Sequence, residues 1–132
     1  MRFEKFTTSL QEALSEAQSL AVGRDHQYIE PQHLLAALLD QENGGTAALL
    51  AKAGGNVPAL RQNLAQAIGK LPKVEGTPGE VHVSRDLAQL LNVADKEAQK
   101  RGDQYIASEL FVLAATGDKG EVMTGIMAFF RA

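Results

Sequence analysis

The residue types that most often carry out chemistry are sparse and scattered in this 132-residue sequence. There are three histidines, His26, His33 and His82, and no cysteine. No two histidines are spaced for one helix face, and no carboxylate cluster accompanies them, whereas a metal site needs three or four converging ligands. We therefore expect no metal ion and interpret the histidines as solvent-facing or capping residues. The lack of cysteine excludes disulfides, zinc fingers and thiol catalysis.

Motifs for nucleotide binding and nucleophilic catalysis are missing as well. Gly120 and Gly125 have the spacing of a phosphate-binding loop, but two apolar residues follow where a lysine and a serine or threonine must reach phosphate and metal. The serines lack the setting of a nucleophile elbow. Asp103 and Glu109 suggest an acid pair, but both fall near predicted helix ends, where acids commonly serve as caps. We expect neither enzymatic activity nor a cofactor.

The elements that would position these residues are helices. Apolar residues recur every three or four positions from Leu10 to Ala21, and Thr8 or Ser9 is the expected cap of that helix. Apolar spacing together with proline, asparagine and glycine boundaries predicts further helices over about 31–43, 46–53, 57–69 and 87–101. The longest apolar run has six residues, so we expect no membrane span and no signal peptide.

The second half of the chain repeats the first. A shift of 77 residues aligns positions 6–39 with 83–116 and gives nine identities in 34 positions, where composition alone would give about two or three. The apolar stripes coincide too. We infer one all-α domain over 1–132, with two pseudo-twofold helical repeats around one core. Repeat one is 1–68, the linker is 69–82, and repeat two is 83–132, each repeat having about four helices and the second being incomplete.

Differences between the repeats indicate where apolar side chains could be exposed. Val93 aligns with Glu16, and Leu110 aligns with His33. We expect Leu91, Val93 and Leu110 to keep some exposure and to line one groove between the repeats. The alternative is that repeat two is simply more buried.

The last residues are unusually apolar. Six large apolar side chains occur in 121–130, so we expect a helix that packs against Phe111 and leaves a patch near Phe129 and Phe130. Weak self-association would cover that patch. The formal net charge of −3 is spread evenly along the chain, which argues against a nucleic-acid platform. A cytoplasmic location is compatible with these features.

Three segments carry a resemblance to a known family. FTTSLQEALSEAQSLAVGRDHQYIEPQHLLAALL resembles the N-terminal domain of Clp-family unfoldases, a pseudo-twofold double repeat. LPKVEG and QKRGDQYIASELFVLAA resemble the ClpB branch, the protein disaggregases, more than the ClpA or ClpC branches. The resemblance covers about 1–116 and fades from Thr116 onward.

The resemblance implies a non-enzymatic domain that engages exposed apolar stretches of unfolded or aggregated polypeptides for the AAA+ modules of a parent chaperone. Nucleic acid and membrane are not expected partners. The family's substrate-contact positions fall, residue by residue, on Thr7, Leu91, Val93, Asp103, Glu109 and Leu110. An alternative is a docking module for a dedicated adaptor protein, as in the ClpA and ClpC branches.

Overall fold

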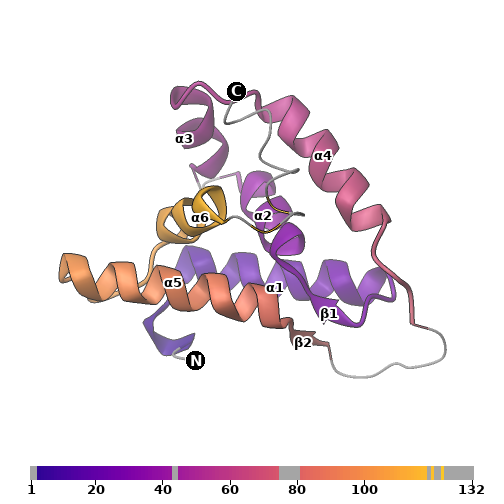
Figure 1. Ribbon diagram of the computed structural model, residues 1–132, viewed down its shortest axis with the longest axis horizontal. Coiled ribbons are helices and arrows are strands. Elements are labelled where there is room, and N and C mark those ends of the chain that lie inside the picture. The colour runs from indigo at the N-terminus through magenta and orange to yellow at the C-terminus, as the bar shows by residue number, and fades with distance from the viewer. Residues whose placement is uncertain (1–2, 43–44, 75–80, 119, 121–122, 124–132) are drawn as a thin grey trace.

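Helices dominate the computed structural model, which describes residues 3–42, 45–74, 81–118, 120 and 123 (Figure 1). A 3-10 turn, η1 (Phe3–Lys5), precedes six α-helices: α1 (Thr8–Gly23), α2 (Pro31–Asp40), α3 (Thr46–Lys52), α4 (Val57–Gly69), α5 (Arg85–Arg101) and α6 (Ser108–Gly117). Two strands, β1 (Tyr28–Ile29) and β2 (His82–Val83), pair in parallel. The all-α prediction is confirmed, apart from these two strands, which are too short to show an alternating pattern.

Side-chain caps set the beginnings of three helices. The Thr7 hydroxyl accepts a hydrogen bond of 3.3 Å from the Leu10 amide and so caps α1. Ser84 caps α5, and Asn56 caps α4. The expected caps of α1, Thr8 and Ser9, are therefore wrong by one or two residues. All of these residues are helix-capping types, so sequence alone does not separate them.

The two repeats exchange their N-terminal segments across a pseudo-twofold axis. The Thr7 amide donates to the Ile106 carbonyl at 3.0 Å, and the Ser84 amide donates to the Ile29 carbonyl at 3.0 Å. Ser84 lies 77 positions after Thr7, and Ile106 lies 77 after Ile29. The same shift maps α1 onto α5 and α2 onto α6. The predicted pseudo-twofold repeat is confirmed, and below we call two residues 77 positions apart counterparts.

One apolar core lies between the two pairs of helices. Helix α1 packs on α2, α5 packs on α6, and α2 also contacts α5, α6 and α4. Helix α4 lies along α2 at one side of the molecule (Figure 1). The predicted stripe of α1 is buried at Leu10, Ala13, Ala17 and Ala21, and its counterparts in α5 are buried as well. The end of α5 is exposed from Gln99 to Arg101, whereas Glu109 is the exposed residue in the first turn of α6.

The residues that follow α4 pair with the turn after α1. The Val74 amide donates to the Asp25 carbonyl at 2.8 Å, and His26 and Lys73 form an antiparallel bridge. Asp25 has a φ of 60°, in the left-handed region, and its counterpart Gly102 has a φ of 75°. The same turn therefore follows α1 and α5, but in repeat one it has an extended segment paired to it.

Part of the tail prediction falls on a described residue. Met123 is buried and belongs to the apolar core. The predicted helix over 121–130 and the patch near Phe129 and Phe130 lie outside the described residues. Within the ranges that the structure describes, none of the helices has both the length and the apolar character needed to cross a bilayer.

Candidate functional site

Three of the predicted site residues are carried by segments that meet at one junction between the repeats. The Thr7 amide binds the Ile106 carbonyl, and Asp103 and Glu109 each lie three residues from Ile106 along the chain. Asp103 follows the left-handed Gly102 at the end of α5, and Glu109 lies in the first turn of α6. We call Thr7, Asp103 and Glu109 the junction site.

The junction site presents two carboxylates to solvent. Asp103 and Glu109 are exposed, Thr7 is half-buried, and neither carboxylate forms an ion pair with another described residue. Glu109 also lies at the positive end of the α6 dipole, which holds a negative charge there at little cost. Beside it, the buried Ser108 hydroxyl has no hydrogen-bond partner in the described part of the chain. These groups favour a cationic, hydrogen-bonding ligand.

The expected apolar groove is not present as three exposed side chains. Val93 is 47% exposed, as predicted, but Leu91 is 1% and Leu110 is 6% exposed. The predicted exposure of Leu91 and Leu110 is therefore wrong. Leu91 belongs to the core-facing stripe of α5, and Leu110 packs into the core from the first turn of α6. At these two positions the alternative, a more buried second repeat, holds.

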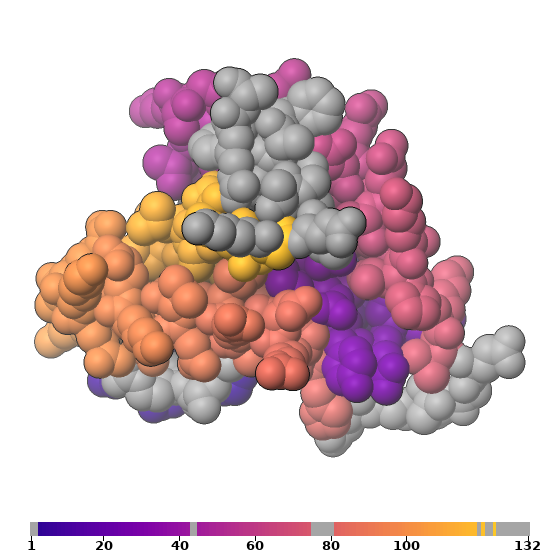
Figure 2. Space-filling model, in the orientation of Figure 1, coloured from indigo at the N-terminus to yellow at the C-terminus, as the bar shows by residue number. Residues whose placement is uncertain are grey.

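Two other apolar side chains of repeat two are exposed and were missed. Tyr105 is 55% and Leu113 is 49% exposed. The signal for Leu113 was present in the sequence: six consecutive apolar residues in α6 cannot all face one core, and the buried face is fixed by Phe111, Ala114 and Ala115. Figure 2 shows α5 and α6, in orange to yellow, as one continuous surface of the molecule.

At the other junction between the repeats, the residues equivalent to the junction site are buried. The counterparts of Thr7, Asp103 and Glu109 are all buried and carry no carboxylate: Ser84, His26 and Gln32. The backbone of the turn beside them is paired to Lys73 and Val74. The two repeats thus build the same junction twice, once occupied by the chain's own linker and once exposed with two negative charges.

The buried histidines differ from the expectation. His26 and His33 are buried, so solvent-facing is wrong for both, whereas the capping role holds for His33, whose Nδ1 accepts the Glu30 amide at 2.8 Å. Burial lowers the pKa of both side chains, that of His33 to about 4. Over the described residues, His, Asp and Glu side chains form no group of three that would suit a metal ion.

Comparison with known protein families identifies the family of this chain. A family model described as the Clp repeat (R) N-terminal domain matches residues 5–128. The chain belongs to this family. It is 51% identical over 119 residues to a ClpB chaperone of Dichelobacter nodosus, and 52% identical over 120 residues to that of Vibrio cholerae. The alignments cover 90% and 91% of this chain but only 14% of each chaperone. The resemblance to the ClpB branch is confirmed.

Solved structures of Clp N-terminal domains share the fold. The Hsp104 N-terminal domain from Candida albicans matches with a TM-score of 0.82 at 23% identity, covering 96% of this chain and 82% of that one. A ClpV N-domain in complex with a VipB peptide matches with a TM-score of 0.71 at 23% identity, covering 95% and 78%. At these identities the likeness concerns the fold of the Clp domain alone.

Proposed function

We propose that this Clp N-terminal domain is a non-catalytic recognition module that binds exposed segments of unfolded or aggregated polypeptides. It would present them to the AAA+ modules of a longer, ClpB-like disaggregase in the cytoplasm. The contact surface would lie on repeat two and on Thr7 of repeat one, with Thr7, Asp103 and Glu109 at its polar end and Val93, Tyr105 and Leu113 as its apolar part. Leu91 and Leu110 belong to the same two helices, α5 and α6, but lie in the core.

The observation that carries this proposal is the extended segment paired to the counterpart turn. In repeat one the Val74 amide donates to the Asp25 carbonyl, and the backbone of Lys73 forms an antiparallel β-bridge with that of His26. The counterparts of Asp25 and His26 are Gly102 and Asp103: Asp25 and Gly102 both have a positive φ, and the His26 and Asp103 amides donate to the counterpart carbonyls of Ala21 and Ala98. The linker therefore serves as an internal example of how an extended polypeptide would pair with Gly102 and Asp103 by strand addition.

Charge supports a basic residue in that bound segment. In repeat one the residue bridged to Lys73 is His26, whose pKa is lowered by burial first and then by the nearby Arg24 and Lys73 side chains, so an imidazole rather than a carboxylate lies opposite Lys73. A residue of a bound segment that paired with Asp103 as Lys73 pairs with His26 would face the Asp103 carboxylate. Glu109 follows six residues later. A lysine or arginine there would gain a charge-assisted hydrogen bond. A short pairing of this kind buries little area, so weak binding is expected.

The experiment is a titration followed by amide NMR. Two ligands are used: a permanently unfolded polypeptide, and the peptide KLPKV, which has the sequence of residues 70–74. Both should shift amides around Asp103 and Glu109. Asp103→Lys should weaken both by roughly tenfold, since it reverses an exposed charge next to the bound cation. Asp86→Lys, an equal charge change at the exposed start of α5, is the matched control and should leave binding unchanged.

A second modification tests the pairing itself. Methylating the valine amide of the peptide removes the donor equivalent to that of Val74 and should abolish peptide binding. If the unfolded polypeptide binds but shifts no amide of α5, α6 or the turn between them, the proposed surface is wrong. If neither ligand binds, the recognition function is wrong.

Docking of one dedicated partner, such as an adaptor protein, is the second candidate, since a ClpV N-domain has been solved in complex with one peptide, from VipB. An adaptor would give one saturable, stoichiometric complex with a single partner sequence. A substrate surface would bind many unrelated unfolded sequences weakly. A panel of unrelated peptides, each with one lysine, separates the two: similar weak affinities across the panel support substrate recognition.

A further inference from the structure

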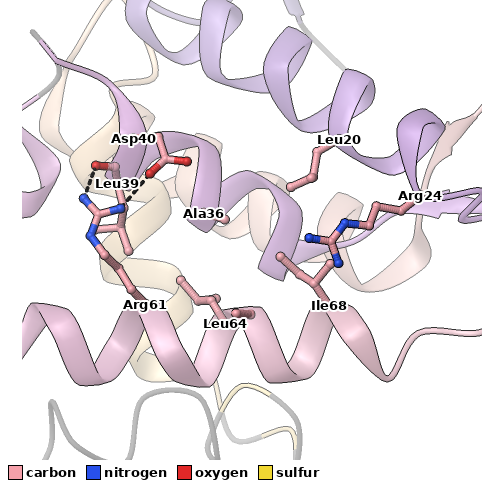
Figure 3. Close-up of a pocket in the computed structure, with 9 residues that line it drawn as sticks. Leu20, Arg24, Ala36, Leu39, Asp40, Arg61, Leu64 and Ile68 are labelled. Carbon is pink, nitrogen blue, oxygen red and sulfur yellow. Dashed lines mark hydrogen bonds and ion pairs between the residues drawn. The ribbon is translucent and has the colours of Figure 1, made fainter.

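A cavity of about 210 Å³ lies between α1, α2 and α4, all of repeat one (Figure 3). Its walls are mainly aliphatic, with Leu20 from α1, Leu39 from α2, and Leu64 and Ile68 from α4. This volume is below the roughly 300 Å³ at which sites for drug-sized ligands begin, so it suits a group of about one side chain. We call it the α4 cavity.

Two arginines lie at the α4 cavity, and among the described residues only one of them has an ion-pair partner. The Arg61 guanidinium donates from Nη1 to an Asp40 oxygen at 2.6 Å and from Nη2 to the Leu39 carbonyl at 2.7 Å. Arg24 forms no ion pair with any described residue and reaches from the end of α1 toward Ile68 (Figure 3). The cavity therefore joins an apolar interior to an available guanidinium.

The counterpart of Arg24 has a carboxylate partner. Arg101 is paired with Glu97, Nε to Oε1 at 2.9 Å, one turn earlier on α5. The counterpart of Glu97 is Leu20, which lines the α4 cavity. In repeat one, the position that holds the arginine's carboxylate partner in repeat two is thus an aliphatic wall. A carboxylate from outside the chain would restore the pairing, and a planar guanidinium binds carboxylates in a bidentate manner.

We propose that the α4 cavity binds the carboxyl-terminal residue of a polypeptide that ends in an aliphatic side chain. The side chain enters between Leu20 and Ile68, and the terminal carboxylate pairs with Arg24. A terminal residue carries both groups on one Cα atom, which matches the adjacency of guanidinium and apolar wall. A fatty acid shares this chemistry, but its long chain exceeds the volume of the cavity.

The test is an amide NMR titration with the peptide acetyl-Gly-Ser-Ala-Leu, carrying either a free carboxylate or a terminal amide. The free acid should shift the amides of Ala36, Ala65 and Ile68 and saturate at about 10 mM or below. The terminal amide should bind roughly tenfold more weakly, because it lacks the charge. Equal binding of acid and amide, or shifts confined to other elements, would overturn the proposal.

Matched variants complete the design. Arg24→Gln should weaken binding of the free-acid peptide to the level of the amide peptide. Arg101→Gln, the counterpart change, should leave binding of both peptides unchanged. Ala65→Phe fills the cavity from the exposed face of α4 and should abolish binding with the fold intact. Unchanged binding in Arg24→Gln or Ala65→Phe refutes the site. Asp103→Lys should leave this binding unaltered, so the α4 cavity and the junction site succeed or fail separately.

Discussion

The Nδ1 atom of His26 lies 2.9 Å from the Nε2 atom of His33, and both rings are buried in repeat one. Because the Nδ1 of His33 accepts the Glu30 amide, its Nε2 carries the proton and donates it to His26. Burial, followed by the neighbouring His26 and Arg24, lowers the pKa of His33 to about 4. Repeat two has Leu110 at the counterpart position, so it lacks this polar pair.

This pair predicts loss of stability in mild acid. Unfolding returns His33 to its ordinary pKa of about 6.5, so below pH 6.5 the unfolded chain binds a proton that the folded domain does not. The contribution of neutral His33 to the free energy of unfolding is present above about pH 6.5 and is lost as the pH falls toward 4. Between pH 7.5 and 5 we expect a loss of roughly 2 kcal/mol, measured by urea unfolding, with His26 acting in the same direction.

The control is His33→Leu, which copies the counterpart residue Leu110. At pH 7.5 it should be less stable than the parent domain, because the Glu30 amide and His26 each lose a partner. Its free energy of unfolding should change less between pH 7.5 and 5. An unchanged pH dependence in this variant would show that His33 is not the titrating group.

The same residues show what the sequence could and could not reveal. Helices and the duplication follow from apolar spacing and from the shift of 77 residues, both local patterns. Exposure at Leu110 was inferred because its counterpart His33 is polar. That inference failed because a histidine can be fully buried when both ring nitrogens are hydrogen-bonded. Polarity at one position therefore does not report exposure, and only the tertiary contacts decide it.

Val93 shows when the comparison of repeats succeeds. Its counterpart Glu16 is exposed, as a charged residue without a buried partner must be. The pairing of Lys73 with His26 could not be read from the sequence at all, because it joins a glycine- and proline-rich linker to a turn by backbone groups. Those groups are the same for every residue type, so only the fold reveals the occupied and open copies of the junction.

The turn after α1 predicts a stabilising substitution. Asp25 adopts a φ of 60°, which is unfavourable for a residue with a Cβ atom, and its counterpart is Gly102. Asp25→Gly should raise the free energy of unfolding by up to about 1 kcal/mol, because the strain outweighs the extra freedom of glycine in the unfolded chain. Thermal or urea unfolding measures this directly.

The reverse change at the counterpart should have the opposite sign. Gly102→Ala places a Cβ atom at a φ of 75° and should cost about 1 kcal/mol, although open space surrounds the position. A stabilised Gly102→Ala would mean that the turn after α5 relaxes to another conformation. In that case the correspondence between the two turns would not hold.

The two counterpart caps separate stability from binding. Thr7 caps α1 and Ser84 caps α5. In each case the hydroxyl accepts a hydrogen bond from the amide three residues later. Each change to alanine should cost about 1 kcal/mol of stability. Thr7 also belongs to the open junction site, whereas Ser84 lies in the closed one. Only Thr7→Ala should weaken binding of an unfolded polypeptide, as measured by fluorescence anisotropy well below both melting temperatures.

Burial separates Val93 from Leu110 as tests of the recognition surface. Val93 is 47% exposed, so Val93→Gln should change the free energy of unfolding by no more than about 0.5 kcal/mol. It should still weaken binding of an unfolded polypeptide severalfold, because it removes apolar contact surface. Leu110→Gln places an amide in the core and should cost about 3 kcal/mol, a fall of more than about 10 °C in melting temperature.

Calorimetry and a binding titration on the two variants decide between two roles for Leu110. If Leu110→Gln is as stable as the parent domain, its side chain leaves the core readily and can contact a bound segment directly. If it is destabilised as expected, any loss of binding reflects a disturbed start of α6, where Glu109 lies. Val93→Gln then becomes the cleaner probe of the surface, because a binding defect in that variant cannot arise from unfolding.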